Sequence, residues 1–308
     1  MIAIAPALFL WLSTTNPSTA TTMAVSFGHA PEKLGLQRES ESSPEGPGSL
    51  AVDDLGRVYV LDAVHARVAV FDKGVFVSEV ALGSDTVEDI AVTASLDVVA
   101  LDRVNERVVR VLAGNGSVVA TANVEGRGVD DGGDVTAVFA DASGVWVEVA
   151  RGTQVRVLDD DLHEDVARVT RPGLPFGDGY VRQRLVKGSA QVLFFDQAQR
   201  LVDDGVVHFS STLRLAGLAV RTTADGQQRL FVAAHELVQK KPGQKPERDA
   251  IVVVEVEKTR SGLVERDRRT LKASPEFVPL KELVATTTGA AHLYVDSFTQ
   301  TGAEVTSW

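Results

Sequence analysis

The chain has 308 residues, a formal net charge of -11 and a pI near 5.1. Proteins that bind nucleic acids concentrate positive charge, so this balance argues against a nucleic-acid partner. The sequence contains no Cys, which excludes disulfides, a thiolate nucleophile and a Cys-ligated zinc. Hydrophobic residues make up 44% of the chain, enough for a buried core, while aromatic residues make up only 6% and Val predominates, which favours strands.

The first twenty residues have the pattern of a secretory signal peptide. An apolar run from Ile2 to Leu12 precedes polar residues and Ser18-Thr19-Ala20, whose small side chains suit a signal peptidase. No Lys or Arg precedes the run, and a buried apolar N-terminus is the alternative interpretation. The run is shorter than the roughly 20 residues of a transmembrane helix, so no membrane span is expected in the mature chain. The pattern predicts a periplasmic or secreted protein that begins at residue 21.

The mature chain opens with a short apolar segment, residues 22–28, that has no neighbouring partner strand. Residues 29–46 are rich in Glu, Ser and Pro and are expected to form an exposed connection. Four short Val-rich runs separated by turn residues follow, and such runs predict antiparallel strands. The four runs are Leu50–Val52, Val58–Leu61, Val68–Phe71 and Val75–Leu82.

The residues of this first unit occur in a defined order: Gly46-Pro47, Leu50-Ala51-Val52-Asp53, Gly56-Arg57-Val58-Tyr59-Val60, Asp62, His65-Ala66-Arg67-Val68 and Val70-Phe71-Asp72. That order resembles an NHL-type β-propeller blade. The resemblance implies a ring of four-stranded blades. Propellers of this type include binding scaffolds and enzymes, so the resemblance does not settle an activity.

Further copies of the unit follow. In the second copy, Val99 lies 40 residues after Tyr59, and the spacing from Asp62 to Arg67 recurs from Asp102 to Arg107. The third copy starts at Asp134, and there Val149 and Gln154 replace the repeated Asp and Arg. A fourth copy spans residues 185–211, with Asp196 closing its second strand.

The fifth copy starts near Leu215 and contains an insertion, residues 237–249, whose Pro, Gly and charges are expected to exclude a packed strand. The sixth copy, from Leu283, has only three strands and would expose an unpaired edge. Residues 22–28 supply the missing strand. The sequence therefore predicts an all-β, six-bladed β-propeller of four-stranded antiparallel blades, closed by the N-terminal strand in the last blade. The predicted single domain is 21–308, with blades at about 46–86, 87–128, 132–172, 178–212, 213–272 and 276–308.

In a propeller, the loops between second and third strands and those between blades lie on one face around the central channel. We expect the repeated Asp and Arg residues to be structural, because Asp caps turn amides and Arg can bridge neighbouring strands. These residues are Asp62, Arg67, Asp102, Arg107 and Asp196.

Four acidic residues precede the first strands of blades two and three: Glu88, Asp89, Asp131 and Asp134. If their carboxylates converge on the channel, they would bind calcium through oxygen ligands. The alternative is a solvated rim of charge on an acidic protein. The chain has no D-x-[DN]-x-[DN]-G loop, so no cofactor is predicted and no metal site is assigned; calcium remains the alternative that convergent carboxylates would allow.

The fifth copy carries two further candidates on the channel face. His235 ends its second strand and would serve as a proton shuttle, or alternatively is an ordinary loop residue. The insertion carries Lys240, Lys241 and Lys245, which would recognise an anionic partner or pair with the protein's own acidic rim. A solvated loop without a partner is the remaining interpretation.

No catalytic motif is present, because the chain lacks a G-x-S-x-G elbow, an H-E-x-x-H pair and a phosphate-binding glycine loop. The sequence therefore favours a platform that binds an unknown protein or small ligand on its channel face, without predicting catalysis. The alternative function is a metal-dependent hydrolase or lyase that uses calcium or zinc. A third interpretation is a structural partner in an envelope assembly.

Overall fold

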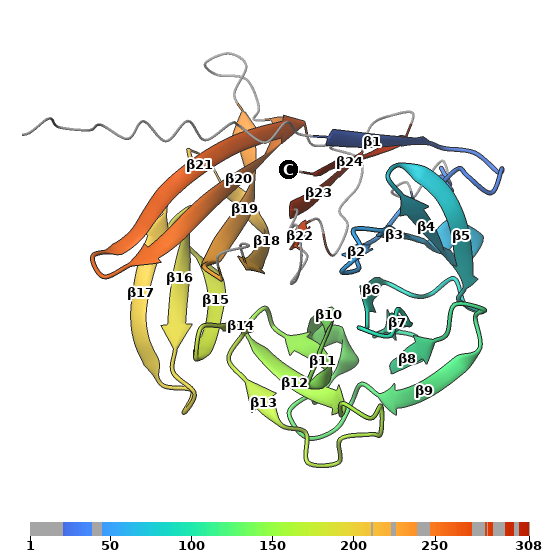
Figure 1. The fold of residues 1–308 in the computed structure, drawn as a ribbon, viewed down its shortest axis with the longest axis horizontal. Coiled ribbons are helices and arrows are strands. Elements are labelled where there is room, and N and C mark those ends of the chain that lie inside the picture. The colour runs from blue at the N-terminus through green and yellow to red at the C-terminus, as the bar shows by residue number, and fades with distance from the viewer. Residues whose placement is uncertain are drawn as a thin grey trace, which may run out of the picture.

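A computed structural model describes residues 21–38, 45–210, 212–222, 226–238, 247–272, 281, 283–285, 293–298 and 302–307. Its strands pair into six four-stranded antiparallel sheets that surround a common axis, so the chain forms an all-β propeller (Figure 1). Each sheet is called a blade below, and the blades are numbered along the chain. Among the described residues no helix is long and apolar enough to cross a membrane.

Within blades 1 to 5 the strand order follows the chain from the axis outward. Blade 1 consists of β2 (Leu50–Val52), β3 (Val58–Asp62), β4 (Arg67–Asp72) and β5 (Val75–Ala81). Blade 2 consists of β6 (Asp89–Val92), β7 (Val98–Asp102), β8 (Val108–Leu112) and β9 (Val118–Asn123). Blade 3 consists of β10 (Val135–Asp141), β11 (Gly144–Val149), β12 (Thr153–Leu158) and β13 (Thr170–Arg171). Blade 4 consists of β14 (Leu174–Phe176), β15 (Gly179–Val186), β16 (Ser189–Phe195) and β17 (Leu201–Val207). Blade 5 consists of β18 (Thr212–Thr222), β19 (Gln228–Val238), β20 (Glu247–Thr259) and β21 (Gly262–Lys272). Two 3-10 turns, η1 (Ala63–His65) and η2 (Gly132–Asp134), precede β4 and β10.

Blade 6 combines strands from both ends of the sequence. It contains β22 (Leu283–Ala285), β23 (Leu293–Phe298), β24 (Gly302–Ser307) and, at its outer edge, β1 (Thr21–Ser26). β1 lies antiparallel to β24 in an unbroken register from Thr21 opposite Ser307 to Ser26 opposite Gly302. The expected pairing of an N-terminal strand with the last strand of the chain is therefore present.

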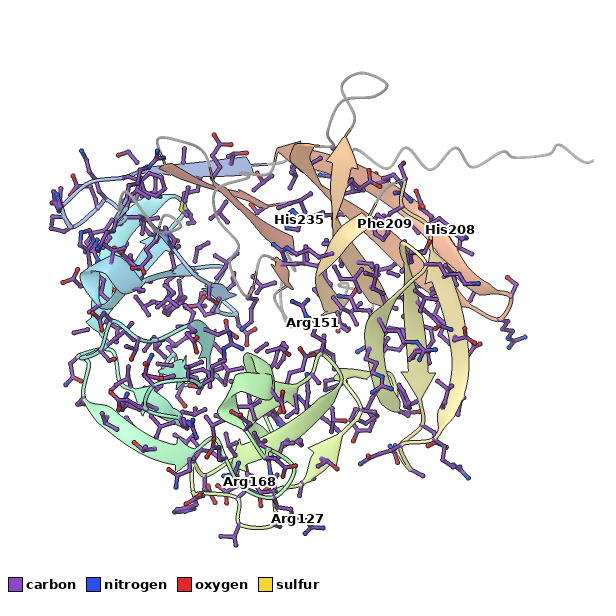
Figure 2. The ribbon with its side chains drawn as sticks, turned by 180° about the vertical axis from the view of Figure 1, so that it is seen from behind. Arg127, Arg151, Arg168, His208, Phe209 and His235 are labelled. Atoms are coloured by element: carbon purple, nitrogen blue, oxygen red, sulfur yellow. The ribbon has the colours of Figure 1, made fainter. Side chains whose placement is uncertain are left out.

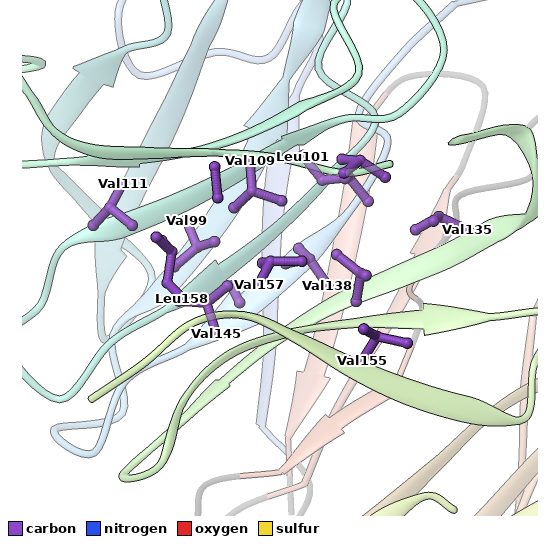
Figure 3. Close-up of a cluster of buried hydrophobic side chains, with 14 of the residues drawn as sticks. Val99, Leu101, Val109, Val111, Val135, Val138, Val145, Val155, Val157 and Leu158 are labelled. Carbon is purple, nitrogen blue, oxygen red and sulfur yellow. The ribbon is translucent and has the colours of Figure 1, made fainter. Parts of the chain in front are cut away.

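Alternating Val residues build the core between neighbouring blades. Figure 3 shows the cluster between blades 2 and 3, where Val99 and Val109 meet Val145 and Val155 from the next sheet. Because successive strand residues point to opposite faces, each sheet can pack on both neighbours. Similar clusters join blades 6 and 1, 1 and 2, 4 and 5, and 5 and 6. Among the described residues no such cluster joins blades 3 and 4.

The structure corrects the expected insertion at residues 237–249. β19 continues through Val238, and β20 already begins at Glu247, with Leu237 opposite Arg248 and Val238 opposite Glu247. The expectation of no strand was wrong at both ends of this segment. The strand-breaking Pro and Gly all fall within residues 239–246, which lie outside the described residues, so the flanking residues are able to pair.

Two other expectations also need correction. Residues 29–46 are not wholly exposed, because Leu34 is fully buried in the cluster between blades 6 and 1. Blade 4 begins at β14, before residue 178, where its start was expected. Leu-Pro-Phe is too short to be identified as a strand by periodicity, and its Pro is tolerated because β14 is an edge strand.

Candidate functional site

Asp62 and Asp102 each organise the turn that follows the second strand of a blade. Asp62 is fully buried and accepts hydrogen bonds from the Gly35 amide at 2.9 Å, His65 Nδ1 at 2.8 Å and Arg67 Nε at 3.0 Å. Asp102 accepts from the amides of Asn105 and Glu106 at 3.0 and 2.9 Å. These are the contacts of a carboxylate that caps a turn.

Asp196 was expected to close the second strand of its blade, but it follows β16, the third strand of blade 4, because β14 and β15 begin earlier in the chain than expected. In that turn it accepts from the Arg200 amide at 2.9 Å. The two repeated Arg residues differ. Arg67 is buried and also donates to Glu79 on β5, whereas Arg107 is half-exposed and pairs with Glu125 at 2.7 Å. The repeated residues therefore stabilise loops and leave little capacity for a ligand.

The acidic residues before blades 2 and 3 do not converge. Glu88 pairs with Arg103 Nε at 3.1 Å. Asp131 is exposed and accepts from the Gly133 amide at 2.8 Å, and Asp134 is exposed as well. In the part of the chain that the structure describes, no three His, Cys, Asp or Glu side chains group as a metal site requires. Calcium binding stays a prediction of the sequence.

Asp89 lies at the axis instead of on the rim, and it is fully buried. It accepts from the amides of Ile90 at 2.9 Å and Val138 at 2.7 Å, and from the Ser49 hydroxyl. Lys281 Nζ lies 3.2 Å from its second oxygen. This carboxylate is therefore committed to an internal ion pair.

Lys281 precedes β22 and was not singled out from the sequence. Its buried ammonium donates to the carbonyl oxygens of Ile90 and Val138, both at 2.7 Å, and lies 5.2 Å from the centroid of the Phe139 ring. One side chain of blade 6 thus joins the inner strands of blades 2 and 3. An isolated Lys before an apolar run carries no pattern that predicts this contact.

His235 was expected at a loop near the channel face, and the structure places it elsewhere. It is fully buried within β19, opposite Arg214 on β18 and Ile251 on β20 (Figure 2). The extension of the β19–β20 hairpin moves it from the end of a strand into the sheet. Lys240, Lys241 and Lys245 lie outside the described residues.

Three residues of blade 3, Thr136, Glu148 and Arg151, form what we call the channel mouth. The Thr136 hydroxyl donates to Glu148 Oε2 at 2.6 Å and accepts from the Arg151 amide at 3.2 Å. The exposed Arg151 side chain lies near the centre of the ring in Figure 2, and its Nη1 is 3.4 Å from the Leu215 carbonyl oxygen of blade 5. It thus reaches from blade 3 to blade 5 past the inner strand of blade 4.

Burial raises the pKa of Glu148. The Thr136 hydrogen bond and the charges of Arg151 and Lys281 act against that rise, while the charge of Asp89 adds to it. The channel mouth therefore combines an exposed cation with a carboxyl that holds its proton more tightly than an ordinary Glu.

Replacement of Glu148 by glutamine should change the pH dependence of stability. Because the folded pKa is raised, wild-type stability relative to E148Q is greatest below the ordinary pKa of 4.5 and falls as the pH rises through the folded pKa. Urea unfolding of both proteins over a pH series measures this difference. The exposed Glu32→Gln variant is the control, and equal pH profiles for E148Q and wild type would contradict the prediction.

Neither Glu148 nor Arg151 was identified from the sequence. They flank Val149, where the repeated Asp is lost, and they precede Gln154, where the repeated Arg is lost. The loss of the repeated Asp and Arg in the third copy is the sequence signal that points to these residues, because it marks the blade whose turn is organised differently.

No protein-family model matches the chain, and no curated protein matches it. A streptogramin B lyase structure is 9% identical with a TM-score of 0.46, covering 93% of this chain and 97% of its own. Virginiamycin B lyase from Staphylococcus aureus is 10% identical with a TM-score of 0.44, covering 94% and 99%. The PQQ domain of pyranose dehydrogenase from Coprinopsis cinerea is 12% identical with a TM-score of 0.46, covering 85% and 92%. At these identities and scores, no function is transferred from them to this chain.

Proposed function

We propose that this chain is an extracytoplasmic, NHL-type six-bladed propeller that serves as a binding platform for a small ligand at the channel mouth. The first blade and the apolar segment before residue 21 support the family and the location. The observation that carries the binding function is the exposed guanidinium of Arg151 at the centre of the ring.

The chemistry of the mouth suits recognition of a polar ligand. A guanidinium presents five N–H donors, and the Leu215 carbonyl takes one of them at the long distance of 3.4 Å. Glu148 stands beside it as a carboxyl whose raised pKa favours the protonated form, which can donate a hydrogen bond. Two of the acidic residues predicted for the channel face are already paired, since Glu88 binds Arg103 and Asp89 binds Lys281.

The alternative function, a metal-dependent hydrolase or lyase, has no supporting contact among the described residues. It stays a prediction made from the sequence, as does a protein partner for the channel face.

Substitution of Arg151 by alanine should abolish ligand-induced stabilisation. A collection of small polar molecules is screened by thermal unfolding of the wild-type chain. A ligand at one hundred times its Kd adds about 2.7 kcal/mol, which raises Tm by on the order of 5 °C. In R151A this rise should disappear for every ligand bound at the mouth, because the central donor is lost.

Arg127→Ala is the matched control. Arg127 is also exposed and its Nη1 also lies 3.4 Å from a carbonyl oxygen, that of Ala167, but it lies at the outer rim (Figure 2). R127A should respond to ligands as wild type does. Ligands that stabilise R151A and wild type equally would place binding elsewhere and refute the proposed site.

A further inference from the structure

The face of blade 3 that points toward blade 4 is polar and aromatic. In the register, Trp146 lies opposite Arg156, and Gln154 lies between Glu148 and Arg171. The alternating residues, including Val145, Val147 and Val155, point the other way into the cluster with blade 2. This blade therefore presents a hydrophobic face to one neighbour and a charged face to the other.

The face of blade 4 that points toward blade 3 also carries polar and aromatic side chains. Tyr180 lies opposite Phe195 and Arg182 opposite Leu193, whereas Val181 and Val192 point into the cluster with blade 5. We call the contact between these two faces the seam. It is the contact between neighbouring blades for which no hydrophobic cluster exists among the described residues.

The arginines that blade 3 places on the seam have carboxylate partners. Arg171 is buried, stacks 3.9 Å from the Trp146 centroid and donates to Asp141 at 2.6 Å and to Gln154 Oε1 at 2.7 Å. Arg156 donates to Asp165 at 2.8 Å. Both positive charges are therefore neutralised within the protein.

Arg182 of blade 4 differs. Its guanidinium lies 5.1 Å from the Phe195 ring, and it has no hydrogen bond or ion pair with any residue that the structure describes. It is half-buried against the turn of blade 3, where a Cβ on Gly152 would lie 3.3 Å from Arg182 Nη1. A half-buried cation in this position has no counter-ion in the described chain.

Gln154 supplies a second donor on the opposite side of the seam. The side chain is fully buried, its oxygen accepts from Arg171, and its Nε2 has no hydrogen-bond partner. Leaving a buried amide donor unpaired costs about 1–3 kcal/mol. Gln154 follows Gly152, which lies beside the Arg182 guanidinium, by two residues, a separation of roughly 7 Å in a strand, so both donors belong to the same part of the seam.

We propose that the seam between blades 3 and 4 is a binding site for an oxyanion, the carboxylate or phosphate group of a small ligand, held by Arg182 and by Gln154 Nε2. A guanidinium binds either group through paired N–H donors, and the amide adds a third hydrogen bond. The site borders the channel mouth, since Gln154 lies opposite Glu148 in the register, but it does not use Arg151.

Calorimetric titration of the full chain with sodium phosphate and, separately, with sodium acetate tests the proposal. Sodium chloride at equal ionic strength is the reference for screening. Saturable binding of one or both anions is expected, and which of them binds identifies the source of the oxyanion. R182M should weaken that binding at least tenfold, because it removes the guanidinium of the seam that has no partner in the described part of the chain. R182K should weaken it less.

Arg184→Met is the control, since Arg184 lies two residues away on β15, is exposed and already donates to Gln191 Oε1 at 2.8 Å. Gln154→Met should weaken anion binding, because it removes the unpaired amide donor; its effect on Tm combines the loss of that donor with the loss of the acceptor of Arg171. If R182M does not fold, as judged by circular dichroism, anion binding by R182K and Q154M tests the proposal instead. Absence of saturable heat beyond that of chloride, or equal loss in R182M and R184M, would overturn the oxyanion site while leaving the R151A experiment unaffected.

Discussion

Replacement of Lys281 by methionine is expected to lower the free energy of unfolding by about 3–5 kcal/mol, because it leaves the Asp89 carboxylate buried without its cation. The side chain of Asp89 is fully buried and that of Lys281 is 11% exposed. The carbonyl oxygens of Ile90 and Val138 lose a donor at the same time. Urea unfolding of K281M and wild type measures the loss.

Two further variants decide whether this loss arises from the buried charge. The double variant D89N/K281M should recover part of the stability, since neither charge then remains. Lys258→Met is the matched control, because Lys258 also pairs with an Asp and lies 3.9 Å from the centroid of a Phe ring, but its partner Asp203 is 47% exposed. K258M should change Tm little. A K281M protein as stable as K258M would contradict the prediction.

Removal of β1 should have an equally large effect. A chain that starts at residue 29 lacks the outer strand of blade 6. The backbone groups of β24 then lose their hydrogen bonds to β1, and β24 becomes an exposed edge strand. The core between blades 6 and 1 also loses Val25, which is 5% exposed. We expect a large fall in Tm and concentration-dependent aggregation, measured by circular dichroism and light scattering.

A chain that starts at residue 21 is the control, since it keeps the whole of β1 and should unfold as the full chain does. Added in trans, a peptide with the sequence of residues 21–28 should restore part of the Tm of the shortened chain. An unchanged melting curve after removal of residues 21–28 would refute closure by β1.

Local patterns were sufficient to predict the strands. The four short Val-rich runs of the first unit reappear as β2 to β5, within one or two residues of the expected ends. The partner of residues 22–28 could also be inferred, because a missing strand and a spare strand occurred in the same chain. β14 could not be recognised, since three residues are too few to show a period of two.

The candidate site was less accessible to sequence reasoning. Strand periodicity shows which residues share a face of one blade, but it does not show which charges meet across the axis. The Lys281–Asp89 pair joins residues from blades 6 and 2, and Arg151 reaches blade 5. The seam could be recognised only when the polar face of blade 3 and that of blade 4 were placed opposite each other. Those contacts depend on the closed ring and on no local pattern.

The pairing of β1 with β24 has a consequence for how the protein is made. Thr21 leaves the ribosome early, and its partner Ser307 is synthesised 286 positions later. Blades 1 to 5 can form as the chain emerges, but blade 6 must wait for the last strand, and closing so long a loop is entropically costly and slow. Until synthesis ends, β1 is an unpaired strand that needs protection by a chaperone or by its own solubility.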